Sequence, residues 1–335
     1  MKILITGASG FIGSFIVEEA LRRGLDTWAA VRRSSSRAYL QDERINLIEL
    51  NLDSESDLRR QLQGQDFDYV VHAAGVTKCI DKADFHRINT LGTEHLVRAI
   101  HALQMPLRRF VYLSSLSVYG AIHEQLPYTP ISEGDTPQPN TAYGKSKLEA
   151  ERWLDRFVAE EAPDFPCVVL RPTGVYGPRE RDYFLMAQSI KQHTDFAAGF
   201  QRQDITFVYV TDVVQAVFLA IDHGQPGRKY FLSDGEVYQS TTFSDLIIEE
   251  LGRPWCLRVK APLWVLRAVT FVGEYVGRLT GKVTALNNDK YNILRQRNWQ
   301  CDIGPALREL GYQPQVKLAE GVRRTIKWYK DNGWL

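Results

Sequence analysis

Short apolar runs recur through the first half of the chain, and segments with a helical spacing of apolar residues lie between them. Continuous apolar runs of this length are typical of strands that are buried on both faces of a sheet. The predicted strands are residues 3–5, 28–31, 45–50, 69–73, 110–113 and 168–170, and the predicted helices are residues 11–23, 85–103 and 143–161. Strands that alternate with helices predict an α/β fold, a doubly wound parallel sheet whose ligand site lies at the carboxyl ends of the strands.

The alternation loosens after Gly177. Residues 207–210 and 212–221 still predict one more strand and helix, but the segments around them alternate less regularly. We therefore expect a sheet domain made of residues 1–177 and about 205–223, and a smaller lobe made of about 178–204 and 224–335. We find no internal repeat, low-complexity stretch or flexible linker in the sequence.

Residues 262–279 are the most apolar helix candidate. Arg267, Glu274 and Arg278 fall on one narrow stripe at about 100° per residue, and apolar side chains cover most of the remaining surface. With three charges this helix is a poor candidate for spanning a bilayer. We favour a helix packed on the smaller lobe. The alternatives are the wall of an apolar pocket and a face that rests on a membrane, which co-sedimentation with lipid vesicles tests.

Composition places the chain among ordinary globular proteins. Of its 335 residues, 44% are hydrophobic and 24% are charged, which excludes a disordered or fibrous chain. The 41 Lys and Arg residues nearly balance the 40 Asp and Glu residues, and the formal net charge of +1 provides no broad positive surface for a phosphate backbone. We therefore expect no nucleic-acid partner.

The cysteines and the amino terminus indicate a cytoplasmic protein. Cys79, Cys167, Cys256 and Cys301 lie far apart without a CxxC pair, so we expect reduced thiols and neither a metal site nor a disulfide framework. The apolar run at residues 3–5 is too short for a signal peptide. Any contact with a membrane is expected to be peripheral.

A glycine-rich turn joins the first predicted strand to the first predicted helix. Glycines allow backbone amides to approach a pyrophosphate, and the helix N-terminus adds a favourable partial charge. A plain tight turn uses the same residues, but the buried strand before the turn and the amphipathic helix after it favour dinucleotide binding. The sheet domain is therefore predicted to be a Rossmann domain, and the smaller lobe to bind substrate. The candidate contacts in the turn are Gly7, Ser9, Gly10, Phe11, Ile12 and Gly13.

The end of the second predicted strand favours NADP over NAD. NAD binding asks for an acidic residue about twenty positions after the glycines, and none stands there. Arg32, Arg33 and Ser34 instead offer guanidinium groups and a hydroxyl for a 2′-phosphate, although a solvated turn would look the same. After the third strand, Leu52 and Asp53 are expected near the adenine, and Asp53 can equally cap the helix that follows.

Two further segments carry candidate chemistry. Tyr143 and Lys147 are four residues apart, so they share a helix face. A free phenol has a pKa of about 10, and a nearby ammonium favours its ionised form, which makes such a tyrosine a useful acid and base. Ser114 and Ser115 follow the fifth predicted strand, and strand alternation turns them to opposite faces. We therefore expect only one of them to face a substrate, and Ser117 is a further candidate for lining the pocket.

With the glycine turn and residues 72–75, these segments resemble the extended short-chain dehydrogenase/reductase family from residue 2 to about residue 221. The resemblance implies that Tyr143 moves the substrate proton, Lys147 lowers the pKa of Tyr143 and holds the nicotinamide ribose, and Ser115 binds the substrate oxygen. It also implies that Asn89 is structural; Asp212, which opens a helical pattern, is expected to cap that helix. The further cofactor contacts that it implies are Ala73, Ala74, Gly75, Pro172, Thr173 and Val175.

Family members catalyse several reactions, and the residues near the substrate must distinguish these reactions. Dehydratases place an Asp-Glu pair after the catalytic hydroxyl, where this chain has Leu116 and Ser117, so dehydration is disfavoured. Nucleotide-sugar epimerases resemble the carboxyl end of the chain. Their Arg-x-Gly-Asp pyrophosphate segment is absent, however, and Arg295 or Arg297 would have to replace it.

A reductase of a bulky or lipid ketone fits the apolar helix at 262–279 and the preference for NADP. The resemblance here is to dihydroflavonol reductases, 3β-hydroxysteroid dehydrogenases and bacterial ceramide reductases. We therefore expect an NADP-dependent oxidoreductase of a keto-sphingolipid-like or sterol-like substrate. The alternatives are a nucleotide-sugar 4-epimerase or keto-sugar reductase, and a non-catalytic dinucleotide-binding regulator. By resemblance, helices 85–103 and 143–161 pair in a homodimer, which light scattering tests.

Overall fold

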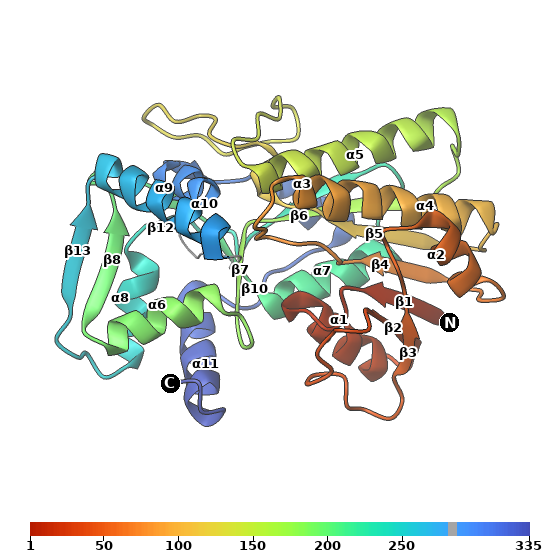
Figure 1. Cartoon of the computed structure of the whole chain (residues 1–335), viewed down its shortest axis with the longest axis horizontal. Helices are drawn as coiled ribbons and strands as arrows, with labels where there is room; N and C mark the ends of the chain where they lie inside the picture. Colours follow the sequence, from red (N-terminus) through yellow and green to blue (C-terminus); the bar gives the residue numbers. More distant parts are fainter. Residues whose placement is uncertain (281–286) are drawn as a thin grey trace.

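A seven-stranded parallel sheet forms the centre of the molecule (Figure 1). The structure, a computed structural model, describes residues 1–280 and 287–335. The strand order is β11-β6-β5-β4-β1-β2-β3. The chain adds β2 and β3 on one side of β1 and then β4, β5, β6 and β11 on the other side, as in a doubly wound fold. The strands are β1 Lys2–Thr6, β2 Asp26–Val31, β3 Asn46–Glu49, β4 Tyr69–His72, β5 Arg109–Leu113, β6 Cys167–Pro172 and β11 Lys229–Leu232. The predicted fold class and all six predicted strands of the first half are confirmed.

Helices cover both faces of this sheet. One face is buried by α1 and α7, and the other by α2, α4 and α5. These helices are α1 Phe11–Arg22, α2 Glu55–Leu62, α4 Gly92–Ala102, α5 Ala142–Glu160 and α7 Val210–Asp222. The helix predicted at 85–103 is a continuous run of α3 Ala83–Phe85, the π-helical turn His86–Leu91 and α4, and a short 3-10 turn, Leu116–Val118, follows β5.

The sheet boundary differs from the expectation at two places. The strand predicted at 207–210 forms β10 (Phe207–Tyr209), which pairs with β7 (Gly174–Tyr176) outside the main sheet. The seventh strand of the main sheet is β11, which pairs with β6 although it lies in the range 224–335 that we expected in the smaller lobe. The reason is that α7 returns the chain to the sheet edge, and a four-residue strand after that return carries little pattern of its own.

The smaller lobe packs beside the carboxyl ends of the sheet strands (Figure 1). Its apolar core lies among α6, α8, α11, β7 and β10. Its helices are α6 Asp182–Lys191, α8 Thr242–Glu250, α9 Leu263–Thr280, α10 Asn288–Arg295, the π-helical turn Ala306–Leu310 and α11 Leu318–Asp331. Its strands are β8 Thr194–Ala198, β9 Asp204–Ile205, β12 Tyr238–Gln239, β13 Leu257–Ala261 and β14 Asn298–Trp299.

Two predicted helix caps have other roles. Asp212 lies in the first turn of α7, and its carboxylate accepts hydrogen bonds from the backbone N–H groups of Gln315 and Val316 at 3.1 and 3.0 Å. It therefore ties the C-terminal segment to the sheet domain and does not cap α7. The cap of α2 is Ser54, whose hydroxyl accepts from the Asp57 N–H, so Asp53 is free of that role.

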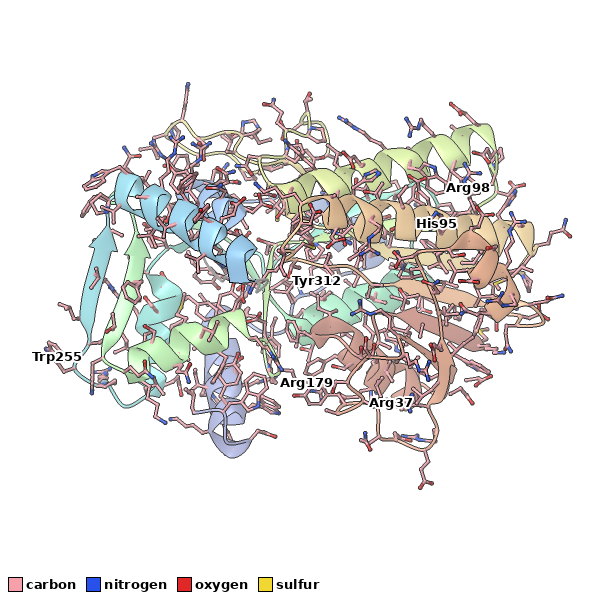
Figure 2. All side chains as sticks on the ribbon, in the orientation of Figure 1. Arg37, His95, Arg98, Arg179, Trp255 and Tyr312 are labelled. Carbon is pink, nitrogen blue, oxygen red and sulfur yellow. The ribbon has the colours of Figure 1, made fainter. Side chains whose placement is uncertain are left out.

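Helix α9 presents its apolar side to solvent. Its Glu274 carboxylate accepts from the Asn288 N–H at 3.2 Å and pairs with Lys82, whereas Trp264 is 75% exposed and Phe271 is 64% exposed. A surface helix usually buries its apolar stripe, so the expected packing on the lobe holds only for its inner side. Trp255, before β13, is also exposed (Figure 2). Among the described residues, no helix has both the length and the apolar character needed to span a membrane. A peripheral contact stays a prediction. The side chain of Arg278, the third charge of the predicted stripe, lies outside the described residues.

Candidate active site

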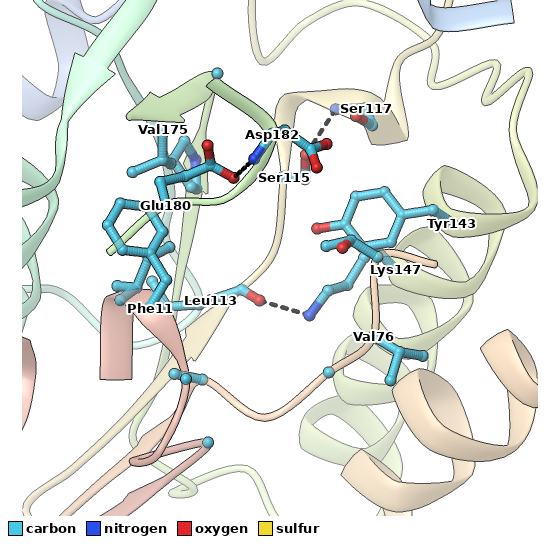
Figure 3. A pocket seen from close by; sticks show the side chains of 18 of the residues that line it. Phe11, Val76, Leu113, Ser115, Ser117, Tyr143, Lys147, Val175, Glu180 and Asp182 are labelled. Carbon is cyan, nitrogen blue, oxygen red and sulfur yellow. Dashed lines mark hydrogen bonds between the residues drawn. The ribbon is translucent and has the colours of Figure 1, made fainter. Parts of the chain in front are cut away.

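One cavity of about 900 Å³ runs from the glycine turn after β1 to α10 in the smaller lobe. It lies outside the carboxyl ends of β1, β4, β5 and β6, where a doubly wound sheet binds its ligand. Figure 3 shows side chains from the turn, from α5 and from the segment before α6 around this cavity. No described residue of α9 lines it, so that helix is not the pocket wall that we gave as an alternative.

The glycine turn has the geometry of a phosphate cradle. Gly7 has a φ of +69°, and a Cβ there would lie 2.6 Å from the Ala73 carbonyl oxygen; a Cβ on Gly13 would lie 2.1 Å from the Gly7 oxygen. Helix α1 begins after Gly10 without a side-chain cap or an acidic residue in its first turn. Its first N–H groups are thus available to an anion, as a dinucleotide pyrophosphate requires. The residues of this turn fit NAD(P).

At the adenosine end, some of the candidate cofactor residues line the cavity and others do not. Arg32, Leu52 and Asp53 line it, whereas Arg33 and Ser34 are exposed and do not. Ser35, which we did not single out, also lines it, and its hydroxyl accepts from the Arg32 N–H at 2.9 Å. The Asp53 carboxylate accepts from Arg87 at 2.5 Å. Of the two arginines predicted to bind a 2′-phosphate, Arg32 lines the cavity and Arg33 does not.

The other candidate cofactor residues meet at the centre of the cavity. All the predicted positions in the two strand-end loops line it: Ala73, Ala74, Gly75, Pro172, Thr173 and Val175. Asn89 is structural, since its side-chain amide binds both the N–H and the carbonyl of Val76 and the hydroxyl of Ser146. This holds the loop after β4 against α5, the helix that carries Tyr143 and Lys147.

Ser115, Tyr143 and Lys147 all line the cavity (Figure 3). Lys147 is buried, and its Nζ donates to the Leu113 carbonyl oxygen at 2.7 Å. The Ser115 hydroxyl accepts from the Ser117 N–H at 3.1 Å, and its proximity to the Tyr143 phenol lowers the pKa of that phenol. Three segments, the end of β5, its following turn and α5, thus bring together the residues that sequence reasoning selected.

The neighbouring serine belongs to a separate buried network. The Ser114 hydroxyl donates to Glu151 at 2.5 Å, and Glu151 also pairs with Arg171 at 2.5 Å. Burial favours the neutral form of Glu151, but the Arg171 guanidinium outweighs it and holds the pKa of this carboxyl below its usual value. Ser114 and Ser115 therefore point to opposite sides, as the strand alternation predicts.

Burial governs the protonation of the catalytic pair. It raises the pKa of the Tyr143 phenol to about 12, and the nearby Ser115 hydroxyl opposes this rise. It lowers the pKa of the Lys147 ammonium to about 8, and the Glu151 carboxylate opposes that fall. The expected role of Lys147, lowering the pKa of Tyr143, stays a prediction. At neutral pH the protein thus presents a neutral phenol, which is a proton donor, beside an ammonium.

The substrate end of the cavity holds residues that sequence reasoning did not select. Its wall is mostly apolar and aromatic, and its lining residues are Tyr183, Met186, Phe196, Ile205, Phe207, Phe243, Ile293, Leu294 and Trp299. They come from α6, β8, β9, β10, α8, α10 and β14, so no single sequence pattern marks them. The one local signal is on α10, where Lys290, Ile293 and Leu294 share a helix face.

A family model described as the NAD dependent epimerase/dehydratase family matches residues 3–233. The chain belongs to this family. The family contains epimerases and dehydratases that work through a bound nicotinamide dinucleotide, so this chain is an epimerase/dehydratase-family oxidoreductase. Membership also confirms the resemblance to extended short-chain dehydrogenases/reductases.

Relatives within this epimerase/dehydratase family match nearly the whole chain. UDP-glucose 4-epimerase of Vibrio cholerae is 26% identical, over 97% of this chain and 94% of that protein. A 4-hydroxy-2-methyl-3-oxo-4-farnesyl-3,4-dihydroquinoline-1-oxide ketoreductase of Stigmatella aurantiaca is also 26% identical, over 96% of this chain and 95% of that protein. The structure of DesIV, a dTDP-glucose 4,6-dehydratase of Streptomyces venezuelae with NAD and TYD bound, has a TM-score of 0.80 at 23% identity and covers 100% of this chain and 98% of its own. This likeness shows the common fold.

Proposed function

We propose that this family member is an NADP(H)-dependent reductase that converts the ketone of a bulky, lipid-like substrate into a secondary alcohol. The observation that carries the proposal is the apolar and aromatic wall at the substrate end of the cavity. Apolar walls with a few placed polar groups bind apolar ligands by excluding water from them. The ketoreductase relative from Stigmatella aurantiaca supports the proposal, since its name places a farnesyl group on its substrate.

A nucleotide-sugar 4-epimerase is the second candidate, and the epimerase relative from Vibrio cholerae favours it. A sugar nucleotide carries a pyrophosphate, which proteins usually bind with arginine or lysine. Arg295 and Arg297 do not line the cavity, so neither replaces the arginine of the absent Arg-x-Gly-Asp segment there. Leu116 and Ser117 stand where a dehydratase has its acidic pair. These features favour the ketone over the sugar nucleotide.

The site residues divide the work of reduction. NADPH held by the glycine turn and Lys147 would supply the hydride for the carbonyl carbon. Ser115 is placed to donate a hydrogen bond to the carbonyl oxygen, where negative charge develops. Tyr143, whose pKa of about 12 keeps it protonated, gives its proton to that oxygen. The Lys147 ammonium stabilises the phenolate that remains and binds the ribose of the cofactor.

The pH dependence follows from Lys147. Its pKa of about 8 means that the ammonium is present below pH 8 and is lost as the pH rises through that value. The reduction rate should therefore be level from pH 6 to about 8 and fall by about tenfold per pH unit above it. A Lys147→Arg variant that keeps activity should not show this fall, since arginine stays charged. A wild-type rate that is level to pH 10 would contradict this role.

Arg32 supports the preference for NADP. We expect Arg32→Ala to weaken NADPH binding by about tenfold or more and to leave NADH binding within about threefold, because a charged hydrogen bond to the 2′-phosphate is lost. Arg33→Ala is the matched control, since Arg33 lies in the turn that directly follows Arg32 and is not among the residues that line the cavity. Titration of cofactor fluorescence measures both. Equal loss in both variants would point to general electrostatic attraction in place of a 2′-phosphate contact.

The reaction is tested with NADPH that carries deuterium at the transferred hydride. The protein is incubated with labelled NADPH and a cell extract, which is then separated into lipid and aqueous fractions. Label in a lipid alcohol supports the proposal, and label in a nucleotide sugar would overturn it in favour of a keto-sugar reductase. Tight cofactor binding without net transfer would favour an epimerase, which returns the hydride to its own intermediate, or a non-catalytic regulator.

The expected homodimer remains a prediction.

A further inference from the structure

Three charged side chains from separate parts of the chain meet at the substrate end of the cavity. Asp182 begins α6, Lys78 lies in the loop after β4, and Lys290 lies on α10. The two carboxylate oxygens of Asp182 are shared between the lysines: one oxygen binds the Lys78 ammonium, and the other lies 3.6 Å from Lys290 Nζ. Figure 3 shows the Asp182 side chain projecting into the cavity from the start of α6. Asp182 and Lys290 both line that cavity.

The other carboxylates nearby are engaged elsewhere. Glu180 accepts from the N–H groups of Asp182 and Tyr183, at 2.9 and 2.7 Å, and so satisfies the start of α6. Asp289 accepts from the N–H groups of Ala142 and Tyr143 at the start of α5. Asp182 is thus the carboxylate that faces the two lysines. Burial favours its neutral form, but Lys290 and Lys78 outweigh this and hold the pKa of this carboxyl below its usual value.

The contact with Lys290 is looser than a normal hydrogen bond, since 3.6 Å exceeds the usual 2.7–3.2 Å between nitrogen and oxygen. Two ammonium groups and one carboxylate also leave an excess positive charge within this cluster. All three side chains are about one-third exposed; Asp182 and Lys290 line the cavity, and Lys78 is held beside them by its ion pair with Asp182. An incoming oxyanion with two or more oxygens can replace the Asp182 carboxylate between the lysines.

We propose that Lys78 and Lys290 bind an anionic group of the substrate, a carboxylate or a phosphate, and that Asp182 is the internal competitor for the same two ammonium groups. The inference rests on the proposed function and narrows its substrate class to an apolar ketone with an acidic group. The apolar wall binds the chain or ring system, and the lysine pair fixes its orientation. In the absence of a ligand, Asp182 pairs with both lysines and keeps them in place. An uncharged analogue cannot replace this carboxylate, so it gains no ion pair with the lysines.

Binding of matched amphiphiles to the NADP-loaded protein tests this without knowledge of the substrate. Isothermal titration compares dodecanoate, dodecyl phosphate and dodecanol below their micellar concentrations. We expect at least one of the two anions to bind about tenfold or more tightly than the alcohol, as charged hydrogen bonds to partly buried ammonium groups allow. The stronger anion identifies the acidic group. Equal binding of all three would overturn the anion site and leave the apolar pocket standing, and binding of none would overturn both.

Substitutions then assign the preference to these residues. Lys290→Met should bring the anion and the alcohol within about threefold, and Lys78→Met should do so if Lys290→Met fails to fold. Lys191→Met, at the exposed end of α6, is the charge-matched control and should keep the preference. Asp182→Asn should tighten anion binding by about threefold or more, because the competitor is removed. Retained preference in both lysine variants, or weaker anion binding in Asp182→Asn, would overturn the proposal.

Discussion

Replacing Tyr143 with phenylalanine is expected to lower deuteride transfer from labelled NADPH by about a thousandfold or more. Tyr143 is half-buried and lines the cavity, and its pKa of about 12 keeps the proton available for the developing alkoxide. Phenylalanine retains the ring, which packs edge-on against Phe85 with ring centroids 6.4 Å apart. The variant therefore loses the proton, but it should keep its fold and its cofactor.

Two measurements separate this chemical role from a structural one. NADPH affinity of Tyr143→Phe should stay within about threefold of the original, because Lys147 and the glycine turn are intact. Tyr275→Phe, on the exposed side of α9, is the control for the same substitution and should transfer deuteride normally. A Tyr143→Phe protein that still reduces the ketone would remove Tyr143 from the mechanism. Loss of NADPH binding together with activity would make it a positioning residue.

The catalytic set could be predicted because its parts depend on local geometry. The period of the helix alone brings Tyr143 and Lys147 to one face, and the period of the strand alone separates Ser115 from Ser114. The structure agrees with the different directions of the two hydroxyls: both serines line the cavity, but the Ser114 hydroxyl binds Glu151, whereas the Ser115 hydroxyl accepts from the Ser117 N–H. The glycine turn is local in the same sense, because it lies between a strand and the helix that directly follows.

Residues that depend on distant partners could not be predicted in this way. The start of a helical pattern made Asp212 look like a cap, but its partners, Gln315 and Val316, lie more than a hundred positions further along the chain. The charge of Lys147 is another case. Spacing indicates that it is near Tyr143, whereas burial and the Glu151 carboxylate set its pKa, and the hydrogen bond to the Leu113 carbonyl sets the direction of its side chain.

The substrate wall is the largest part that the sequence did not reveal. Phe196, Phe243 and Ile293 belong to three elements, and each looks like an ordinary apolar core position until the lobe folds over the sheet edge. Helix α9 is the opposite case. Its apolar side resembles a pocket wall in sequence, but Glu274 turns toward Lys82 and Asn288 and so leaves that apolar side outside.

Replacing Gly13 with alanine should lower NADPH affinity by about a hundredfold or more. The added Cβ would lie 2.1 Å from the Gly7 carbonyl oxygen and 2.7 Å from the Gly7 carbonyl carbon. Both atoms belong to the backbone, so no side chain can rotate away, and the turn itself must open. Opening the turn moves the first N–H groups of α1 away from the pyrophosphate that they bind.

A graded series keeps this test informative if Gly13→Ala folds poorly. A Cβ on Gly10 would lie 3.1 Å from the same Gly7 oxygen, so Gly10→Ala should lose less affinity than Gly13→Ala and should remain folded. Gly134→Ala is the control, because its Cβ meets only the Ser132 hydroxyl at 3.8 Å in a loop away from the cavity. Titration of cofactor fluorescence and circular dichroism on all three measure affinity and folding. If a folded Gly13→Ala or Gly10→Ala protein binds NADPH as tightly as Gly134→Ala does, the pyrophosphate does not lie on this turn. The close backbone packing of the turn would then have no part in binding.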